Sequence, residues 1–219
     1  LMFLYDGAQS IYDQAWIGKK RSFKSVGFDL SGKVRTLTKN FRTTTQISKA
    51  AYSLFKSYES IMDDEHFIEP KLLERHGEFP IFKKFESFME QCNYVKSLLE
   101  GELSSINRKD IVVIARTTEI LKELAMMFNG IGVPAYILDK NISEFSEDKI
   151  KLITMHSIKG LESKVIIMAS CNEGVIPYYT SKEQDAMREQ EIMDSKLFYV
   201  GMTRATDRLF LLSHGKESK

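Results

Sequence analysis

The chain has 219 residues, of which 43% are hydrophobic, so it can bury one good core with a small appendage. Charged residues make up 28%, yet the formal net charge is only +1, which excludes a global positive field and leaves a local groove for any nucleic-acid contact. Cys92 and Cys171 have neither the number nor the spacing of a disulfide framework or a zinc site. No apolar run approaches the ~20 residues of a membrane span, and the first residues lack the features of a signal peptide. We expect a soluble, cytoplasmic protein.

The first residues resemble the end of one structural unit followed by a connecting segment. Leu1 to Tyr5 is an apolar run that predicts a strand, and it stops at Asp6 before a turn with the sequence AQSIY. Because the chain opens inside a strand, we expect it to be part of a longer protein. Residues 17–33 mix lysine and arginine with phenylalanine, which suits either a groove that tracks a phosphate backbone or a solvated loop.

A second strand, Val34 to Lys39, leads through the sequence NFRTTT into a predicted helix. Residues 56–80 are polar and contain the tetrapeptide DDEH at positions 63–66. That tetrapeptide follows a helix-like segment and not a buried strand, so we interpret it as a solvated helix end and not as a metal box. The helix predicted after NFRTTT has apolar residues at core spacing: Ile47, Ala50, Ala51, Leu54 and Phe55.

Strand and helix patterns alternate through the middle of the chain. Such alternation predicts an α/β fold with a mainly parallel sheet and helices on both faces. The expected elements are a strand at 81–85, an amphipathic helix at 86–103, a buried strand at 110–115, an apolar-striped helix to 129 stopped by Gly130 or Gly132, and a strand at 133–138.

Residues 150–170 organise the rest of the chain. Two apolar runs rich in β-branched residues, 150–155 and 164–169, predict buried parallel strands. An open α/β sheet binds its ligand at the carboxyl ends of its strands, so we expect the loop between these runs to be the working edge. The polar residues of this loop are Thr154, His156, Ser157, Lys159, Gly160 and Glu162.

The last predicted helix spans Glu189 to Arg204 and is followed by a strand, 208–213, that closes the sheet. Met193, Leu197 and Val200 form an apolar stripe at helical spacing. Arg204 falls four residues after Val200 and so continues the edge of this buried stripe. Because a lone buried charge costs several kcal/mol, Arg204 needs an anionic partner.

Five of these strings resemble, in the same order, conserved motifs of the superfamily 1 DNA helicases of the UvrD/Rep/PcrA type. They are Asp6 with residues 9–12, NFRT at 40–43, Arg116–Thr117 after a strand, TMHSIKGLE at 154–162, and LFYVGMTRA at 197–205. Residues 193–196 differ from the paired acids and arginines that the family has just before the last motif. The chain lacks the phosphate-binding sequence G-x-x-x-x-G-K-[S/T], so the resemblance implies the second RecA-like domain of a motor whose other half lies elsewhere.

The resemblance also implies an organisation of the chain. Residues 1–16 end the first RecA-like domain, 17–33 form a basic connecting segment, 34–213 form the second RecA-like domain, and 214–219 form a tail. The stretch between Arg116 and Ile150 is too short to hold the large inserted domain of some members, so a compact member is expected.

The same resemblance implies roles for single residues. ATP with Mg²⁺ is the expected cofactor, and no metal ligand is expected in these residues. Single-stranded or partly duplex DNA and the first RecA-like domain are the expected partners. The implied γ-phosphate contacts are Gln9, Arg42 and Arg204, the last as the arginine finger; the implied nucleotide contacts are Phe41, Tyr12, Gly160 and Glu162; and the implied DNA contacts are Thr154, His156, Lys159, Arg116 and Trp16.

Plainer interpretations stay open at this point. Gln9 suits an ordinary turn, Trp16 suits a core, Arg42 suits a solvated surface, and Arg116 suits the cap of a neighbouring helix. The implied function is the motor domain of an ATP-dependent helicase or translocase that moves 3′ to 5′ on DNA and is inactive by itself. The alternatives are an RNA-directed or polymerase-associated motor of the same superfamily, and a non-catalytic RecA-like scaffold.

Overall fold

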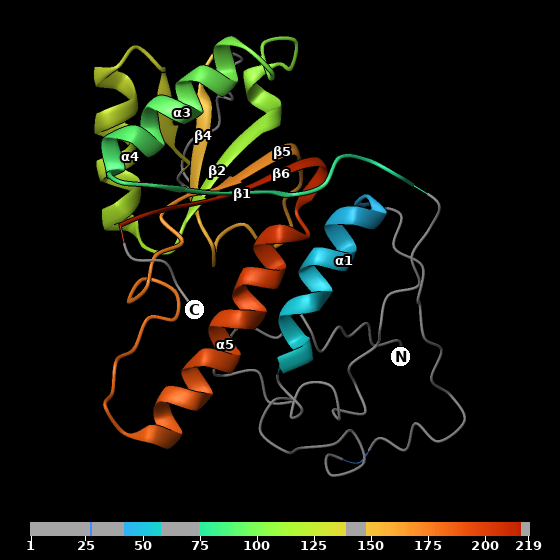
Figure 1. The fold of residues 1–219 in the computed structure, drawn as a ribbon, viewed down its shortest axis with the longest axis vertical. Helices are drawn as coiled ribbons and strands as arrows, with labels where there is room; N and C mark the ends of the chain where they lie inside the picture. Colours follow the sequence, from blue (N-terminus) through green and yellow to red (C-terminus); the bar gives the residue numbers. More distant parts are fainter. Residues whose placement is uncertain (1–26, 28–41, 58–74, 139–147, 216–219) are drawn as a thin grey trace.

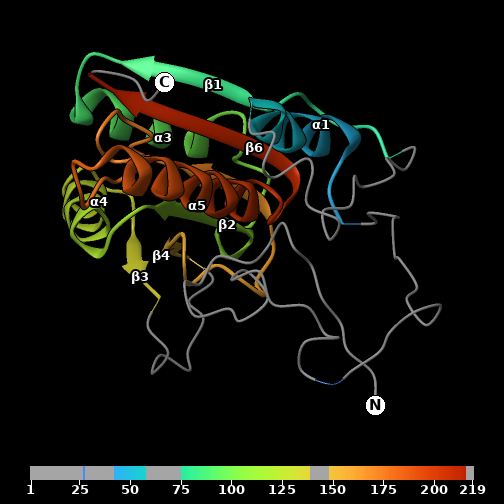
Figure 2. The same ribbon diagram turned by 90° about the horizontal axis from the view of Figure 1, so that it is seen from below.

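Six parallel strands form one sheet in the computed structural model, which describes residues 27, 42–57, 75–138 and 148–215 (Figure 1). The strand order is β1-β6-β5-β2-β4-β3, and every neighbouring pair is parallel. Figure 2 shows β1 and β3 at the two margins of the sheet. The strands are β1 (Ile81–Phe85), β2 (Ile111–Ala115), β3 (Ala135–Ile137), β4 (Ile150–Thr154), β5 (Ser163–Met168) and β6 (Ala205–His214).

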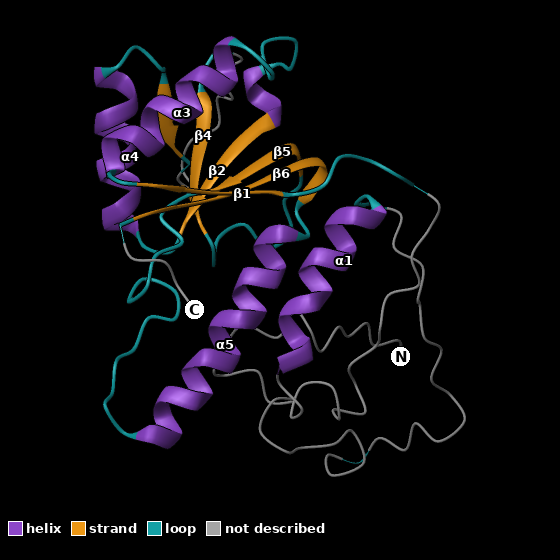
Figure 3. Ribbon diagram, in the orientation of Figure 1, coloured by secondary structure: helices purple, strands orange, loops and turns teal. Residues whose placement is uncertain are grey.

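Helices cover both faces of this sheet (Figure 3). The helices α3 (Phe88–Glu100) and α4 (Thr118–Gly130) lie on one face, and α1 (Thr45–Ser53) and α5 (Gln184–Met202) lie on the other. Two short 3₁₀ helices, η4 (Leu54–Ser57) and η5 (Arg108–Asp110), complete the described elements. The arrangement confirms the expected α/β class with helices on both faces.

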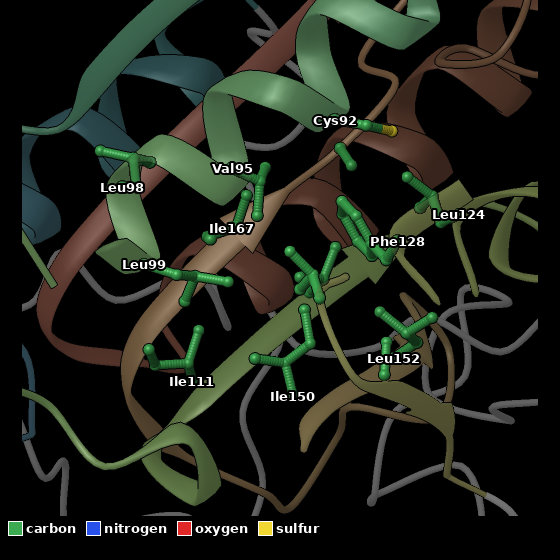
Figure 4. Close-up of a cluster of buried hydrophobic side chains, with 14 of the residues drawn as sticks. Cys92, Val95, Leu98, Leu99, Ile111, Leu124, Phe128, Ile150, Leu152 and Ile167 are labelled. Carbon is green, nitrogen blue, oxygen red and sulfur yellow. The ribbon is translucent and has the colours of Figure 1, made fainter. Parts of the chain in front are cut away.

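Each helix layer buries its own hydrophobic cluster. Alternate residues of the central strands point to opposite faces, so Val113 packs under α3 and α4, whereas Ile114 packs under α1 and α5. Figure 4 shows the first cluster, in which Val95, Phe128 and Ile167 meet between helices and sheet. Burial on both faces explains why β2 is a continuous apolar run, β-branched in its first four residues, with no polar residue.

Threonine and serine caps place the first turns of three helices. Thr44, Ser87 and Thr117 each accept a hydrogen bond from the backbone N–H three residues later, at the starts of α1, α3 and α4. These three helices therefore begin where the sequence has a cap. The boundaries of the described strands also agree with prediction to within two residues, except at the start of β6, whereas the strands predicted at 1–5 and 34–39 lie outside the described residues.

Two predictions at the C-terminal end are wrong. The helix α5 begins at Gln184 and not at Glu189, because its first two turns contain no fully buried residue and so show no apolar stripe. It also ends at Met202, so Arg204 lies in the turn before β6 and not on the helix. Strand β6 does not close the sheet at a margin but lies between β1 and β5.

Among the described residues, the structure has no helix with the length and apolar character that crossing a membrane would require.

Candidate functional site

The loop between β4 and β5 runs from the carboxyl ends of the strands back to their amino ends. We call these two sides of the sheet its carboxyl edge and its amino edge. Thr154 pairs with Ala115 at the carboxyl end of β2, whereas Val165 pairs with Ile111 at its amino end. Because β4 and β5 are parallel and flank β2, the residues between them must return to the amino ends of the strands. The expectation of one working edge is therefore wrong: Thr154 lies at the carboxyl edge and Glu162 at the amino edge.

At the amino edge, the structure brings together three residues that the sequence predicted for the nucleotide site. Nε of Arg42 lies 2.7 Å from Oε2 of Glu162, and the two side chains are 41% and 58% exposed. Ser163, which follows Glu162, donates its N–H to the carbonyl of Arg204 over 3.0 Å. Arg42, Glu162 and the backbone of Arg204 thus lie at the same end of β5 and β6, although they are far apart in the chain.

Arg204 is buried, as its place beside the apolar stripe predicted. Its side chain is 2% exposed, and Nε donates a hydrogen bond to the carbonyl of Val200 over 3.1 Å. That carbonyl belongs to the last turn of α5, where helix carbonyls lack partners within the helix and where the helix dipole favours a cation. The carboxyl end of α5 therefore orients the guanidinium.

Arg75, in the segment before β1, binds the backbone around the start of α1. Arg42 lies just before that helix. Nη1 of Arg75 donates to the carbonyl of Arg42, and Nη2 lies 2.6 Å from Oδ1 of Asp207 on β6. The carbonyl of Arg75 accepts the N–H of Thr45 over 2.8 Å. Arg75 therefore connects the backbone of Arg42 to β6. No sequence pattern predicted this contact, because residues 56–80 show only a polar composition.

The carboxyl edge begins with a tight turn after β4. Oγ1 of Thr154 donates to Oγ of Ser157 over 2.9 Å, and the carbonyl of Thr154 accepts the N–H groups of Ser157 and Ile158. His156 is partly buried and Lys159 is exposed. Gly160 has φ +92°, a conformation that residues with a side chain rarely adopt, so a glycine here lets the chain turn toward the amino edge.

A buried ion pair lies at the same carboxyl edge, next to the end of β2, the strand that neighbours β4. Nη2 of Arg116 lies 2.9 Å from Oδ1 of Asp194 on α5, and the two side chains are 12% and 3% exposed. Asp194 also accepts the N–H of Tyr178 over 2.6 Å and Nε2 of Gln190 over 3.0 Å. The guanidinium of Arg116 lies 5.7 Å from the centroid of the Tyr178 ring. Asp194 therefore joins β2, α5 and the loop between β5 and α5.

Sequence reasoning did not identify Asp194 as a site residue. A signal was present, because Asp194 precedes Leu197 by three residues and so falls on the buried stripe of α5. A carboxylate on such a stripe requires a buried cation, and Arg116 is that cation. Sequence reasoning treated residues 193–196 only as a difference from the family pattern. It therefore did not ask which cation Asp194 would need.

Four of the predicted site residues, Gln9, Tyr12, Trp16 and Phe41, lie outside the described residues, and so does the DDEH tetrapeptide. Within the described ranges, no three His, Cys, Asp or Glu side chains form a group that could hold a metal ion.

The amino edge presents charged groups of both signs. Arg42 offers an exposed guanidinium, of the kind that binds phosphate oxygens, and Glu162 offers an exposed carboxylate that can accept hydrogen bonds from hydroxyl groups. The exposed pair of Arg42 and Glu162 is weakly held, because a solvated ion pair contributes only about 0 to 1 kcal/mol.

Comparisons with known proteins agree with this architecture. The model of the UvrD-like helicase C-terminal domain matches residues 35–142 and 138–216. The probable DNA helicase II homolog of Mycoplasma capricolum is 26% identical over 180 residues, which are 81% of this chain and 22% of that protein. The ATP-dependent DNA helicase PcrA of Bacillus subtilis is 42% identical over 65 residues, or 30% of this chain and 8% of that protein. The ATP-dependent DNA helicase Rep of Buchnera aphidicola is 38% identical over 74 residues, or 34% of this chain and 11% of that protein.

The chain thus spans about a fifth or less of the length of these relatives. Among solved structures, the C-terminal domain of a possible DNA helicase from Lactobacillus plantarum matches with a TM-score of 0.57 at 17% identity, covering 82% of this chain and 90% of that one. This likeness concerns the fold, which is the α/β fold of RecA-like domains. The chain belongs to the UvrD-like helicase C-terminal domain family.

Proposed function

We propose that this chain is the second motor domain of an ATP-dependent DNA helicase or translocase and supplies half of its ATP site. The observation that carries the proposal is that Arg42, Glu162 and Arg204 all lie at the amino edge of the sheet. The family membership and the names of the relatives support it. The parent protein is proposed to be cytoplasmic, with a first RecA-like domain that ends within residues 1–16 and a second that spans residues 34–213.

In the proposed site, Arg42 and Arg204 contact the γ-phosphate, and Glu162 contacts the ribose. Arg204 acts from buried surroundings, where a charge acts on an anion more strongly than it does in water. Gln9 is assigned to the γ-phosphate, and Phe41, Tyr12 and Gly160 to the rest of the nucleotide. Bound ATP with Mg²⁺ supplies the phosphoryl-transfer chemistry, and the first domain supplies most of the metal ligands.

The crossover from residue 155 to residue 162 gives the proposed motor its link between ATP and DNA. One end of this short segment is Glu162 at the amino edge, and the other follows Thr154 at the carboxyl edge. Ile158, at its middle, is fully buried in the cluster under α1 and α5, so the two halves of the segment are coupled through this packed residue. A shift of Glu162 on nucleotide binding is therefore passed to Thr154, His156 and Lys159, the proposed contacts of the DNA strand.

The proposed DNA contacts hold one strand at the carboxyl edge, together with Arg116 and with Trp16 from the segment before the domain. Repeated closure and opening then moves the parent protein along that strand in the 3′ to 5′ direction. The stretch between Arg116 and Ile150 leaves no room for a large inserted domain, so the proposed motor is a compact one.

ATP hydrolysis by the full-length parent protein tests this proposal. We expect hydrolysis that single-stranded DNA stimulates, and no hydrolysis by the 219-residue chain alone. Arg204→Ala in the parent lowers turnover by about 10³- to 10⁵-fold, the effect of losing an arginine finger, while the affinity for single-stranded DNA persists. The matched control is Arg208→Ala, because Arg208 pairs with Glu102 on the α3 side of β6.

Each rival function predicts a different result. An RNA-directed motor shows stimulation by RNA and not by DNA. A non-catalytic scaffold shows no hydrolysis by the parent under any condition. Normal turnover by the Arg204→Ala variant would refute the assignment of the arginine finger.

A further inference from the structure

We propose that Arg75 and Asp207 are positioning residues of the ATP site, which hold the backbone of Arg42 in place relative to Arg204. The inference rests on the proposed function, which assigns Arg42 and Arg204 to the γ-phosphate. It adds two residues that do not touch the nucleotide and that act on it through Arg42.

The first observation is that Arg75 binds the backbone on both sides of the turn between Arg42 and α1. Its Nη1 donates to the carbonyl of Arg42, and its own carbonyl accepts the N–H of Thr45 over 2.8 Å. Two residues further on, the N–H of Gly77 donates to Oε1 of Gln46 over 2.9 Å. The segment before β1 therefore lies against the start of α1 (Figure 1), and the backbone of Arg42 cannot shift without breaking its bond to Arg75.

The second observation is the other contact of the same guanidinium. Nη2 of Arg75 lies 2.6 Å from Oδ1 of Asp207, whose Oδ2 accepts the hydroxyl of Thr206 over 3.1 Å. Asp207 lies three residues after Arg204, in the first turn-proximal part of β6. Arg75 therefore spans the two segments that carry the proposed phosphate contacts. A guanidinium suits this task, because its separate nitrogens can donate to two different acceptors at once.

The third observation is that this connection does not use the side chain of Arg42. A second connection does use it: Nε of Arg42 lies 2.7 Å from Glu162, and Ser163, the next residue, donates its N–H to the carbonyl of Arg204. The proposed function assigns the side chain of Arg42 to the γ-phosphate. The connection through the backbone leaves that side chain available, so it can persist when the nucleotide is bound.

The exposure of the pair separates positioning from stability. The side chains of Arg75 and Asp207 are 43% and 42% exposed. A solvated ion pair contributes little to the free energy of unfolding, so its loss should hardly affect the fold. A displacement of about 1 Å in a group that acts on the reacting atoms can cost about 100-fold in rate. The two effects can therefore be measured apart.

The experiment measures ATP hydrolysis by the full-length parent protein in the presence of single-stranded DNA. We expect Asp207→Ala and Arg75→Ala each to lower kcat about 10- to 100-fold. Each variant should weaken binding of a fluorescent non-hydrolysable ATP analogue and leave that of fluorescent ADP within about twofold, because only the analogue has a γ-phosphate. The midpoint of thermal unfolding should fall by no more than about 4 °C.

Two further variants serve as controls. Asp207→Asn keeps an oxygen that accepts the N–H of Arg75, so its turnover should stay within about fivefold of wild type, the loss reflecting a neutral acceptor in place of a charged one. Glu102→Ala removes the carboxylate from a second ion pair of β6, the one that Arg208 forms on the α3 side of the sheet. Its turnover should stay within about twofold of wild type.

A double variant tests whether the pair acts through Arg42. In the parent that already carries Arg42→Ala, adding Asp207→Ala should lower turnover less than about twofold further, because nothing is left to position. A residue with an independent structural role would lower turnover by the same factor in both backgrounds.

The outcomes separate this inference from the proposed function. If Arg42→Ala lowers turnover but Asp207→Ala or Arg75→Ala does not, the positioning pair is refuted and the proposed function stands. Equal losses from Asp207→Ala with and without Arg42, or equal weakening of ADP and of the ATP analogue, also refute it. If the parent hydrolyses no ATP, or if Arg42→Ala has normal turnover, the proposed site falls and the positioning pair falls with it.

Discussion

Asp194→Ala should unfold this domain far more easily than an equivalent change at the surface. The variant leaves Arg116 as a largely buried charge without its carboxylate, and it leaves the N–H of Tyr178 without an acceptor. Removing one partner of a buried pair costs about 3 to 5 kcal/mol. For a chain of this length, that cost lowers the midpoint of thermal unfolding by about 6 to 20 °C.

The chain contains its own control for this prediction. The pair of Arg42 and Glu162 has the same chemistry and nearly the same length, 2.7 Å against 2.9 Å, but both of its side chains are exposed. We expect Glu162→Ala to cost at most about 1 kcal/mol. Circular dichroism of both variants during heating and in urea gives the two free energies of unfolding. Equal losses would refute the argument that burial, and not the ion pair itself, sets the cost.

Three further predictions concern packing, pH and thiol chemistry. Gly77→Ala should destabilise the chain by about 1 to 3 kcal/mol in urea, because a Cβ would lie 2.4 Å from the Cγ2 methyl of buried Thr44, and wild-type stability would contradict this. Burial lowers the pKa of His214 below its ordinary 6.5, so the unfolded chain binds the proton more readily, and stability present above pH 6.5 is lost as the pH falls below it. His214→Gln should flatten that dependence between pH 7 and pH 5, and an unchanged slope would disprove the assignment. Burial raises the pKa of Cys92 and Cys171 to about 12, so at pH 8 both thiols should alkylate roughly a thousandfold more slowly in the folded than in the unfolded chain, and equal rates would show that the thiols are not held protonated.

The fold could be predicted from the sequence where burial imposes a period. Val113 and Ile114 belong to one apolar run whose neighbours face both helix layers, and such runs predict central parallel strands. Thr44 and Thr117 predict helix starts, because a hydroxyl at that position satisfies an N–H of the first turn. The start of α5 could not be found in this way, since its first turns have no buried stripe.

The candidate site was harder to predict, because it depends on pairs that the sequence does not order. Arg204 was expected to be buried because it follows the apolar stripe, and it is buried, although it lies in the turn after α5 and not on the helix. The two-edge arrangement of Thr154 and Glu162 follows from the strand order, which periodicity does not give. Arg75 and Asp207 are separated by most of the domain, and no local pattern links them.

The place of β6 between β1 and β5 has a consequence for how the chain is made. During synthesis, β1 and α3 leave the ribosome long before β6, which is the strand that β1 pairs with. The strands β3, β4, β2 and β5 can assemble earlier, because each of them pairs with another member of that set. Contacts between residues distant in sequence form slowly. We therefore expect β1 to join the sheet last, and nascent chains that stop before Ala205 to keep a protease-sensitive segment at residues 75–100 while the other strands are already protected.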